Sequence, residues 1–227
     1  VYDGNGAESL EDITFTAKKG DIIGIIGGTG SGKSSLVNLI PRFYDVTKGE
    51  VRINGKDVKE YETESLRARI GVVPQKAALF KGTIAENIRW GKADATEEEI
   101  AKALETAQAA EFVEKKEGKL SYNIEQNGRN LSGGQRQRLT IARALVRKPE
   151  ILILDEVLSV GDMFFRQKSE ARIREMIHGG STVLMVSHST SVIQANCSRA
   201  VWIEKGSLRA DGNPKEVCRA SATLKEK

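Results

Sequence analysis

The chain has 227 residues, of which 29% are charged and 39% are hydrophobic, the composition of an ordinary globular domain that buries one sizeable core. Its net charge of +4 comes from 35 basic and 31 acidic residues, and so small and dispersed an excess does not indicate a nucleic-acid partner. The two cysteines lack the spacing of a metal site or a disulfide framework, and no apolar run approaches the ~20 residues that cross a bilayer.

Two strands are predicted at the start of the chain. Leu10 to Ala17 alternates apolar and polar residues, which is typical of a half-exposed strand. Asp21 to Ile26 is a continuous apolar run that suits a buried parallel strand. A helix is predicted soon after this run and is expected to end near Pro41, because proline removes a helical hydrogen bond.

The residues between this strand and this helix, Gly27 to Ser34, read GGTGSGKS and match the pattern G-x-x-x-x-G-K-[ST]. Glycines let successive backbone N–H groups converge on phosphate oxygens without a Cβ in the way. In this pattern the lysine, Lys33, reaches the β- and γ-phosphates, and the hydroxyl of Ser34 binds Mg²⁺. The sequence therefore predicts a P-loop for ATP and Mg²⁺. Its expected nucleotide-binding residues are Gly28, Thr29, Gly30, Ser31, Gly32, Lys33, Ser34 and Ser35.

Short strands are predicted next. Residues 50 to 58 indicate a hairpin that turns at Asn54-Gly55, a pair that favours tight turns. Together with Leu10 to Ala17, this hairpin suggests an antiparallel β lobe beside the nucleotide. Ile70 to Val73 predicts another short strand, which Gln75 follows closely.

From Lys76 to about Lys148 the pattern becomes helical. A short helix is expected over Thr83 to Trp90. A long helix is expected over Thr96 to Glu117, where Thr96 and the glutamate three residues later form a capping box.

Leu131 to Glu156 reads LSGGQRQRLTIARALVRKPEILILDE. Its first residues predict a glycine-bearing helix N-terminus, and its last six predict a buried strand that ends in Asp155 and Glu156. With the P-loop, this stretch resembles the signature and Walker B motifs of the ATP-binding cassette (ABC) ATPases.

The resemblance implies a fold of the α/β class, that of a P-loop NTPase with a mostly parallel core sheet, an antiparallel β lobe and an inserted helical lobe. The expected single domain covers residues 1–227. Residues 1–75 and 149–227 form the core with the β lobe, and residues 76–148 form the helical lobe.

The resemblance also implies roles around the phosphates. Asp155 is expected to hold Mg²⁺ through water, and Glu156 to act as the general base that polarises the attacking water. Gln75 occupies the place of the Q-loop glutamine, which touches Mg²⁺ or that water and senses the membrane partner. His188 follows a predicted core strand, Thr182 to Val186, and corresponds to the family's switch histidine, which contacts the γ-phosphate. Tyr2 is the candidate for stacking on adenine.

Ser132, Gly133, Gly134 and Gln135 complete the expected nucleotide-binding set. They belong to a different lobe from the P-loop and cannot easily meet it within one chain. The family's solution, which the resemblance implies here, is a head-to-tail homodimer in which each ATP lies between one P-loop and the other copy's LSGGQ. Asp162 is expected at the dimer interface. The other expected partners are transmembrane domains absent from this chain, which would place the protein in the cytoplasm at the inner face of the cell membrane.

Residues 1 to about 150 resemble the multidrug and lipid exporter branch, as in PQKAALFKGTIAENIRWG. Ser121 to Asn130 takes the place of that branch's X-loop, with Gln126 where a glutamate is usual. Residues from Val157 to about 220 instead resemble the ATPases that export O-antigen and teichoic acid. A natural cassette of intermediate type and an engineered chimera joined near the Walker B strand both explain this change, and the chimera is the favoured hypothesis.

The favoured function is ATP binding and hydrolysis by the nucleotide-binding domain of an ABC transporter. One alternative is a folded chimera that binds nucleotide with little turnover. The other is a soluble ABC ATPase of DNA repair or translation. Those proteins carry a long coiled coil or two cassettes, and this chain has neither.

The rest of the chain is expected to complete such a domain. An amphipathic helix is predicted over Arg166 to Ile177. A hairpin is expected about Lys205-Gly206, followed by a closing helix from Pro214, with fraying from Ser221 onward.

Overall fold

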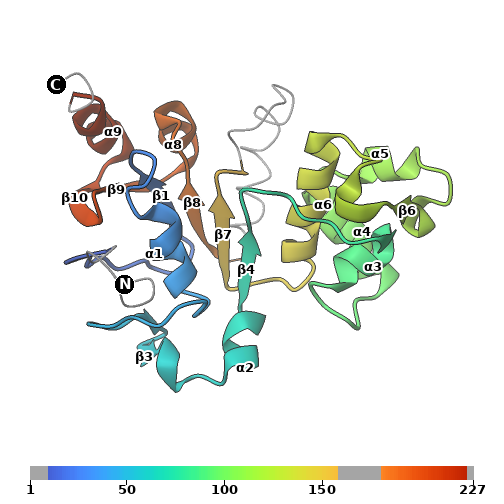
Figure 1. The fold of residues 1–227 in the computed structure, drawn as a ribbon, viewed down its shortest axis with the longest axis horizontal. Helices are drawn as coiled ribbons and strands as arrows, with labels where there is room; N and C mark the ends of the chain where they lie inside the picture. The colour runs from blue at the N-terminus through green and yellow to red at the C-terminus, as the bar shows by residue number, and fades with distance from the viewer. Residues whose placement is uncertain (1–9, 158–179, 224–227) are drawn as a thin grey trace.

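The structure is a computed structural model, and it describes residues 10–157 and 180–223. A six-stranded sheet in the order β10-β9-β1-β8-β7-β4 forms its centre (Figure 1). Neighbouring strands run parallel, except that β10 is antiparallel to β9, so the mostly parallel core sheet that was expected is confirmed. The strands are β1 (Ile22–Ile26), β4 (Ile70–Val73), β7 (Ile151–Asp155), β8 (Thr182–Val186), β9 (Arg199–Glu204) and β10 (Ser207–Gly212).

Both faces of this sheet are covered, which explains why β1, β4 and β8 consist almost entirely of apolar residues. Ile23 and Ile25 of β1 join one core cluster with Val37 of α1. Gly24, between them, faces α8, where a Cβ would come within 2.5 Å of Ile193. The helices that accompany the sheet are α1 (Lys33–Leu39), α2 (Thr63–Ala68), α8 (Thr190–Asn196) and α9 (Pro214–Thr223).

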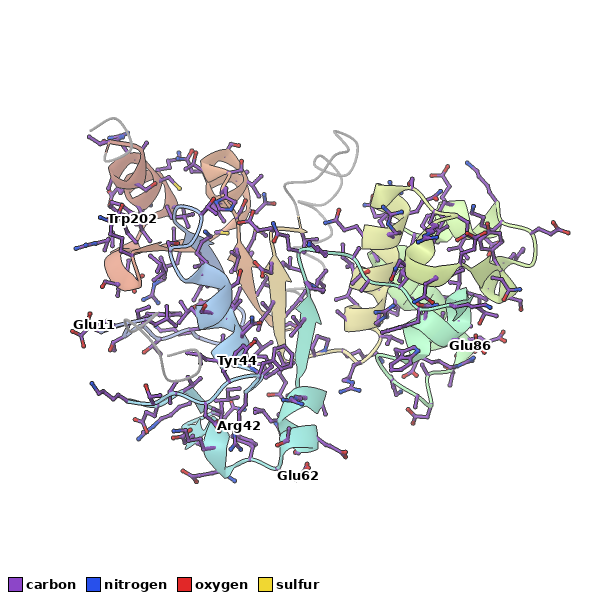
Figure 2. The ribbon with its side chains drawn as sticks, viewed as in Figure 1. Glu11, Arg42, Tyr44, Glu62, Glu86 and Trp202 are labelled. Atoms are coloured by element: carbon purple, nitrogen blue, oxygen red, sulfur yellow. The ribbon has the colours of Figure 1, made fainter. Side chains whose placement is uncertain are left out.

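Four further helices form a group beyond β4, the edge strand of the sheet (Figure 1). Glu86 of this group lies far from Trp202 of β9 (Figure 2). The group packs on the sheet through α6, because a Cβ on Gly71 of β4 would come within 3.0 Å of the carbonyl oxygen of Ala144. The helices of this group are α3 (Ile84–Arg89), α4 (Glu97–Thr106), α5 (Ala110–Glu114) and α6 (Gly133–Leu145).

The predicted tight turns are confirmed. Asn54 and Gly55 have φ of 52° and 80°, and Lys205 and Gly206 have φ of 47° and 79°. Positive φ at both central residues is the type I′ geometry that matches the twist of a hairpin. The short elements are β2 (Arg52–Ile53), β3 (Lys56–Asp57), β5 (Gly82–Thr83), β6 (Asn123–Ile124) and the 3₁₀ turns η1 (Val58–Glu60), η2 (Lys119–Ser121) and η3 (Gln126–Gly128).

Leu10 to Ala17 does not form the predicted strand. Its backbone makes only one isolated bridge, between Glu11 and Ser207, although Ile13 and Phe15 pack against the core. The alternation of apolar and polar residues therefore indicates only which side chains are buried. A hydrogen-bonded strand also needs a partner strand, and β2 and β3, its expected neighbours, are only two residues long.

The single long helix predicted over Thr96 to Glu117 is two helices. Gln108 has φ of 55°, and the N–H of Ala109 donates to the carbonyl of Leu104 at 2.7 Å, so α4 ends in a left-handed cap. The predicted capping box of Thr96 and Glu99 is present at its start. Periodicity did not reveal the break, because apolar residues continue on both sides of it.

At the end of the chain, α9 continues to Thr223, and Ser221 is buried with its Oγ donating to the carbonyl of Cys218 at 2.9 Å. Fraying from Ser221 is therefore wrong for residues 221–223. Within the described ranges, no helix has the length and apolar character needed to span a membrane. The helix predicted over Arg166 to Ile177 lies outside the described residues.

Candidate nucleotide site

The predicted P-loop joins β1 to α1, in the strand–loop–helix order that the pattern requires. Gly32 caps α1 with φ of 98°, a conformation that glycine adopts without strain. Lys33 begins the helix, and its buried ammonium group donates to the carbonyl oxygens of Gly27 at 3.1 Å and Gly28 at 2.7 Å. The loop is thus wrapped around its own lysine, which lies at the centre of the predicted phosphate cradle.

The end of β9 and the β9–β10 turn also hold this loop in place. The N–H of Gly206, in the β9–β10 turn, donates to the carbonyl oxygen of Ser31 at 3.0 Å. Gly27 approaches β9 so closely that a Cβ would come within 2.1 Å of the carbonyl oxygen of Ile203. Ser31 is buried, whereas Thr29, Gly30 and Ser34 are exposed. The exposed side of the loop therefore remains accessible to a ligand.

The two predicted magnesium ligands from distant parts of the chain are adjacent. Ser34 donates from Oγ to Oδ1 of Asp155 at 3.3 Å, across 121 residues of sequence. Ser34 lies in the first turn of α1, and Asp155 is the last residue of β7. A hydroxyl and a carboxylate are both oxygen donors of the kind that Mg²⁺ prefers.

Glu156 is buried, with only 4% of its surface exposed, and has φ of 55°. Its N–H donates to the carbonyl oxygen of Val186, at the end of β8, at 3.0 Å. Its Oε1 lies 2.8 Å from Nε2 of His188, and its Oε2 accepts from the N–H of His188 at 3.3 Å. The carboxylate of Glu156 is therefore held by His188, which follows the neighbouring strand β8.

Both ring nitrogens of His188 face oxygen atoms. Nδ1 lies 3.2 Å from the carbonyl oxygen of Gly27, while Nε2 faces Oε1 of Glu156. A carbonyl oxygen can only accept, so Nδ1 is the donor in its contact with Gly27. His188 therefore contacts both the P-loop backbone and the carboxylate of Glu156.

The carbonyl oxygen of Gly27 is the point where the motifs meet, because it faces both Lys33 and His188. All of these groups stand at or just beyond the carboxyl ends of β1, β7 and β8. This edge is where ligands bind in open parallel sheets. Gln75 is exposed and comes two residues after β4, the next strand of the same sheet.

The residues of the predicted signature lie elsewhere. Ser132 caps α6, its Oγ accepting from the N–H of Gln135 at 3.2 Å while Oε1 of Gln135 accepts from the N–H of Ser132 at 3.0 Å. Gly133 and Gly134 form the first turn of this helix. The predicted helix N-terminus is therefore confirmed. Because α6 lies beyond β4, the structure does not bring it to the P-loop (Figure 1). Tyr2 and Asp162 lie outside the described residues.

Sequence reasoning missed two supporting groups. Gly206 was recognised as a turn residue and not as a support of the P-loop. Gln137 was passed over, although it is buried and its Nε2 donates to the carbonyl oxygen of Val157, directly after Glu156. The available signal was its position, one helical turn before Ile141 on the apolar face of α6.

Comparison with known proteins identifies the family. A family model described as ABC transporter matches residues 10–159 of this chain. The β-(1→2)glucan export ATP-binding/permease protein of Bradyrhizobium diazoefficiens is 44% identical over 216 residues, which cover 95% of this chain and 35% of that protein. The ATP-dependent lipid A-core flippase of Hahella chejuensis is 39% identical over 218 residues, which cover 96% of this chain and 37% of that protein.

Among solved structures, that of a bacterial Atm1-family ABC exporter with ATP bound matches with a TM-score of 0.89 and 32% sequence identity. The match covers 97% of this chain and 38% of the exporter chain. This chain therefore spans about a third of the length of the curated relatives it matches. An alignment that covers 95% of the chain has to cross residues 150–165, so the comparisons lend no support to a join there, and the chimera stays a hypothesis. The chain belongs to the ABC transporter family, as an ATP-binding ATPase domain homologous to those of exporters.

Proposed function

We propose that this chain binds ATP with Mg²⁺ and hydrolyses it between two head-to-tail copies, and that this cycle drives an exporter's membrane-spanning part. The observation that supports it most is the convergence at one sheet edge. Lys33 and His188 both face the carbonyl of Gly27, His188 lies 2.8 Å from Glu156, and Ser34 contacts Asp155. These groups come from three strand ends and one helix.

The donor set fits a magnesium ion that the nucleotide helps to hold. Ser34 and Asp155 supply a hydroxyl and a carboxylate 3.3 Å apart, and we propose the amide oxygen of Gln75 as a third ligand. No cluster of three or more His, Cys, Asp or Glu residues that could hold a metal occurs within residues 10–157 and 180–223. So few protein ligands are enough for Mg²⁺, because it keeps several water ligands and takes the remaining ones from substrate phosphates. When bound, it would neutralise charge on the β- and γ-phosphate oxygens.

Lys33 and His188 would turn to the phosphates when ATP binds. Both groups donate to backbone carbonyl oxygens of the loop, and a phosphate oxygen is a stronger, charged acceptor. Movement of the His188 ring toward the terminal phosphate would release Oε1 of Glu156, which could then accept a proton from the attacking water. His188 thus links the presence of the γ-phosphate to the activation of the base.

The second copy is needed because one chain does not assemble the whole site. Ser132, Gly133 and Gly134 present the start of α6, a helix of 13 residues, and backbone N–H groups at such a start bind anions. The helix lies beyond β4, away from the P-loop (Figure 1). We propose that these residues bind the γ-phosphate held by the other copy's P-loop, and that Tyr2 and Asp162 contribute to adenine stacking and to the interface.

An exposed aromatic pair on the helical lobe (residues 76–148) supports the proposal that this chain binds a membrane partner. Trp90 is 65% exposed and stacks on Phe80 with ring centroids 4.5 Å apart. Arg143 of α6 lies under Phe80 and donates to the carbonyls of Asn87 and Ala78, and burial lowers the pKa of Arg143 to about 10. Exposed aromatic side chains held this firmly are typical of a protein contact surface. In the proposal, the partner's cytoplasmic segments dock here, at the inner face of the membrane.

The test is the specific ATPase activity of the chain as a function of its own concentration. With MgATP in excess, a site shared between copies predicts that activity per chain rises with protein concentration and then reaches a plateau. Chelation of Mg²⁺ should abolish it. Activity per chain that stays constant on dilution, while light scattering reports monomers, would overturn the shared site. Nucleotide binding without turnover at any concentration would favour the non-hydrolysing alternative.

A further inference from the structure

Gln137 is a buried polar residue that connects two motifs. It belongs to α6, the helix that begins at the signature residues, and its side chain is 7% exposed. Its Nε2 donates to the carbonyl oxygen of Val157, itself 1% exposed. Val157 directly follows Glu156, so the amide of a helix beyond β4 holds the main chain beside the proposed base.

Arg143 of the same helix also donates to another segment, but it does so within the helical group, whereas Gln137 reaches the segment that follows Glu156. The buried residues of α6 include two polar ones, Gln137 and Thr140. Thr140 turns inward on its own helix, because its Oγ1 donates to the carbonyl of Arg136 at 2.9 Å. Gln137 instead reaches another segment, 20 residues away in sequence. Of these two buried polar side chains, Gln137 is therefore the one that makes a tertiary contact, and that contact lies next to Glu156.

The main chain at Glu156 needs such support. A φ of 55° is unfavourable for a residue with a Cβ, and surrounding contacts have to maintain it. On one side, the N–H of Glu156 is held by the carbonyl of Val186 at 3.0 Å. On the other side, the carbonyl of Val157 is held by Gln137. One hydrogen bond holds the peptide group that precedes Glu156, and the other holds the peptide group that follows Val157, so the main chain is held on both sides of the carboxylate.

We propose that Gln137 is a positioning residue for Glu156 and links the base to the signature helix of the same chain. The inference rests on the proposed function, in which Ser132 to Gly134 bind the neighbouring copy's nucleotide. Through Gln137, the helix that contacts one ATP also sets the orientation of the base that acts on the other. Loss of the amide should leave the nucleotide bound and the carboxylate misaligned.

The variant Gln137→Leu tests this, because it removes the donor and leaves the carbonyl of Val157 without its partner. A misplaced catalytic group costs up to about a hundredfold in rate, so we expect kcat for MgATP to fall by about tenfold to a hundredfold. The KM and the dissociation constant for ATP should stay within about twofold, because no phosphate contact is lost. Gln137→Met repeats the comparison if the leucine variant fails to fold, as judged by circular dichroism.

Thr140→Val is the matched control, since it removes a buried hydroxyl from the same helix without touching Val157. It should retain kcat within about twofold. An equal fall in both variants would mean that α6 had merely been destabilised and would overturn the positioning role. A change in KM alone, or no change in kcat, would overturn it as well.

A double-mutant cycle with Glu156→Gln separates the two hypotheses. If Gln137 acts through the carboxylate, Gln137→Leu should add less than about a twofold loss once Glu156 is replaced, because residues that act as one unit are not additive. Full, independent losses would overturn the inference alone. Unchanged turnover in the single variant Glu156→Gln would instead refute the proposed base and with it the function from which the inference starts.

Discussion

Glu156 is the residue on which hydrolysis depends most in the proposed function. Replacement by glutamine keeps its size and its contacts with His188 while removing the negative charge that accepts a proton. General-base catalysis contributes about a hundredfold to ten-thousandfold, so phosphate release by Glu156→Gln should fall by about that factor. ATP binding should persist, and dimers should accumulate in size-exclusion chromatography with ATP. Turnover equal to that of the unaltered chain would rule out Glu156 as the base.

The sequence predicted the identity of these residues better than their contacts. The P-loop pattern places Lys33 and Ser34, and the end of an apolar strand places Asp155, because these depend on local spacing. The contacts of His188 with Gly27 and Glu156 span 161 and 32 residues, and no local pattern encodes them. Gln137 was not identified from the sequence for the same reason, since its importance follows from where Val157 lies after folding.

The turn between β9 and β10 is an element whose sequence is not optimal for its shape. Lys205 has φ of 47°, which costs about 1 kcal/mol for a residue with an ordinary Cβ, and asparagine adopts this region more readily. Lys205→Asn should therefore stabilise the chain by about 0.5 kcal/mol and raise Tm by about 1–2 °C. Calorimetry or thermal circular dichroism measures this directly.

The β2–β3 turn supplies the control, because its Asn54-Gly55 pair already has the favoured residue. Asn54→Lys should lower Tm by at least as much, since it also removes the hydrogen bond from Nδ2 to Glu150. A lower Tm for Lys205→Asn would show that Lys205 has a stabilising role that the turn geometry does not reveal. Because this turn holds Ser31 through Gly206, the ATPase rate of the variant is worth recording beside its stability.

Most elements were predictable because hydrophobic period and turn chemistry act locally. The strands at Asp21 to Ile26 and Thr182 to Val186, the two type I′ turns and the capping box at Thr96 all appear where expected. The failures have tertiary causes. Leu10 to Ala17 buries alternate side chains without a partner strand, and the break at Gln108 depends on backbone geometry within an otherwise helical pattern.

At the scale of the whole molecule, the sheet gathers three strand ends into one half of the proposed site, while α6 carries the proposed complementary half beyond β4 (Figure 1). This separation is the reason for proposing two copies. The sequence already indicated it, since the P-loop and LSGGQ belong to different predicted lobes. Sequence could not supply the packing of α6 on β4, which sets how far apart the two halves lie.

Complementation between two inactive variants tests the shared site most directly. Lys33→Ala removes the P-loop lysine and keeps the signature, whereas Ser132→Arg places a bulky side chain at the signature and keeps the P-loop. Each alone should hydrolyse ATP at least about a hundredfold more slowly than the unaltered chain. In an equal mixture, half of the dimers formed at random contain both variants, and each of these has one complete site of two. The account predicts recovery of about a quarter of the normal activity per chain. A mixture no more active than the sum of its parts, although the two variants form mixed dimers with ATP, would contradict it.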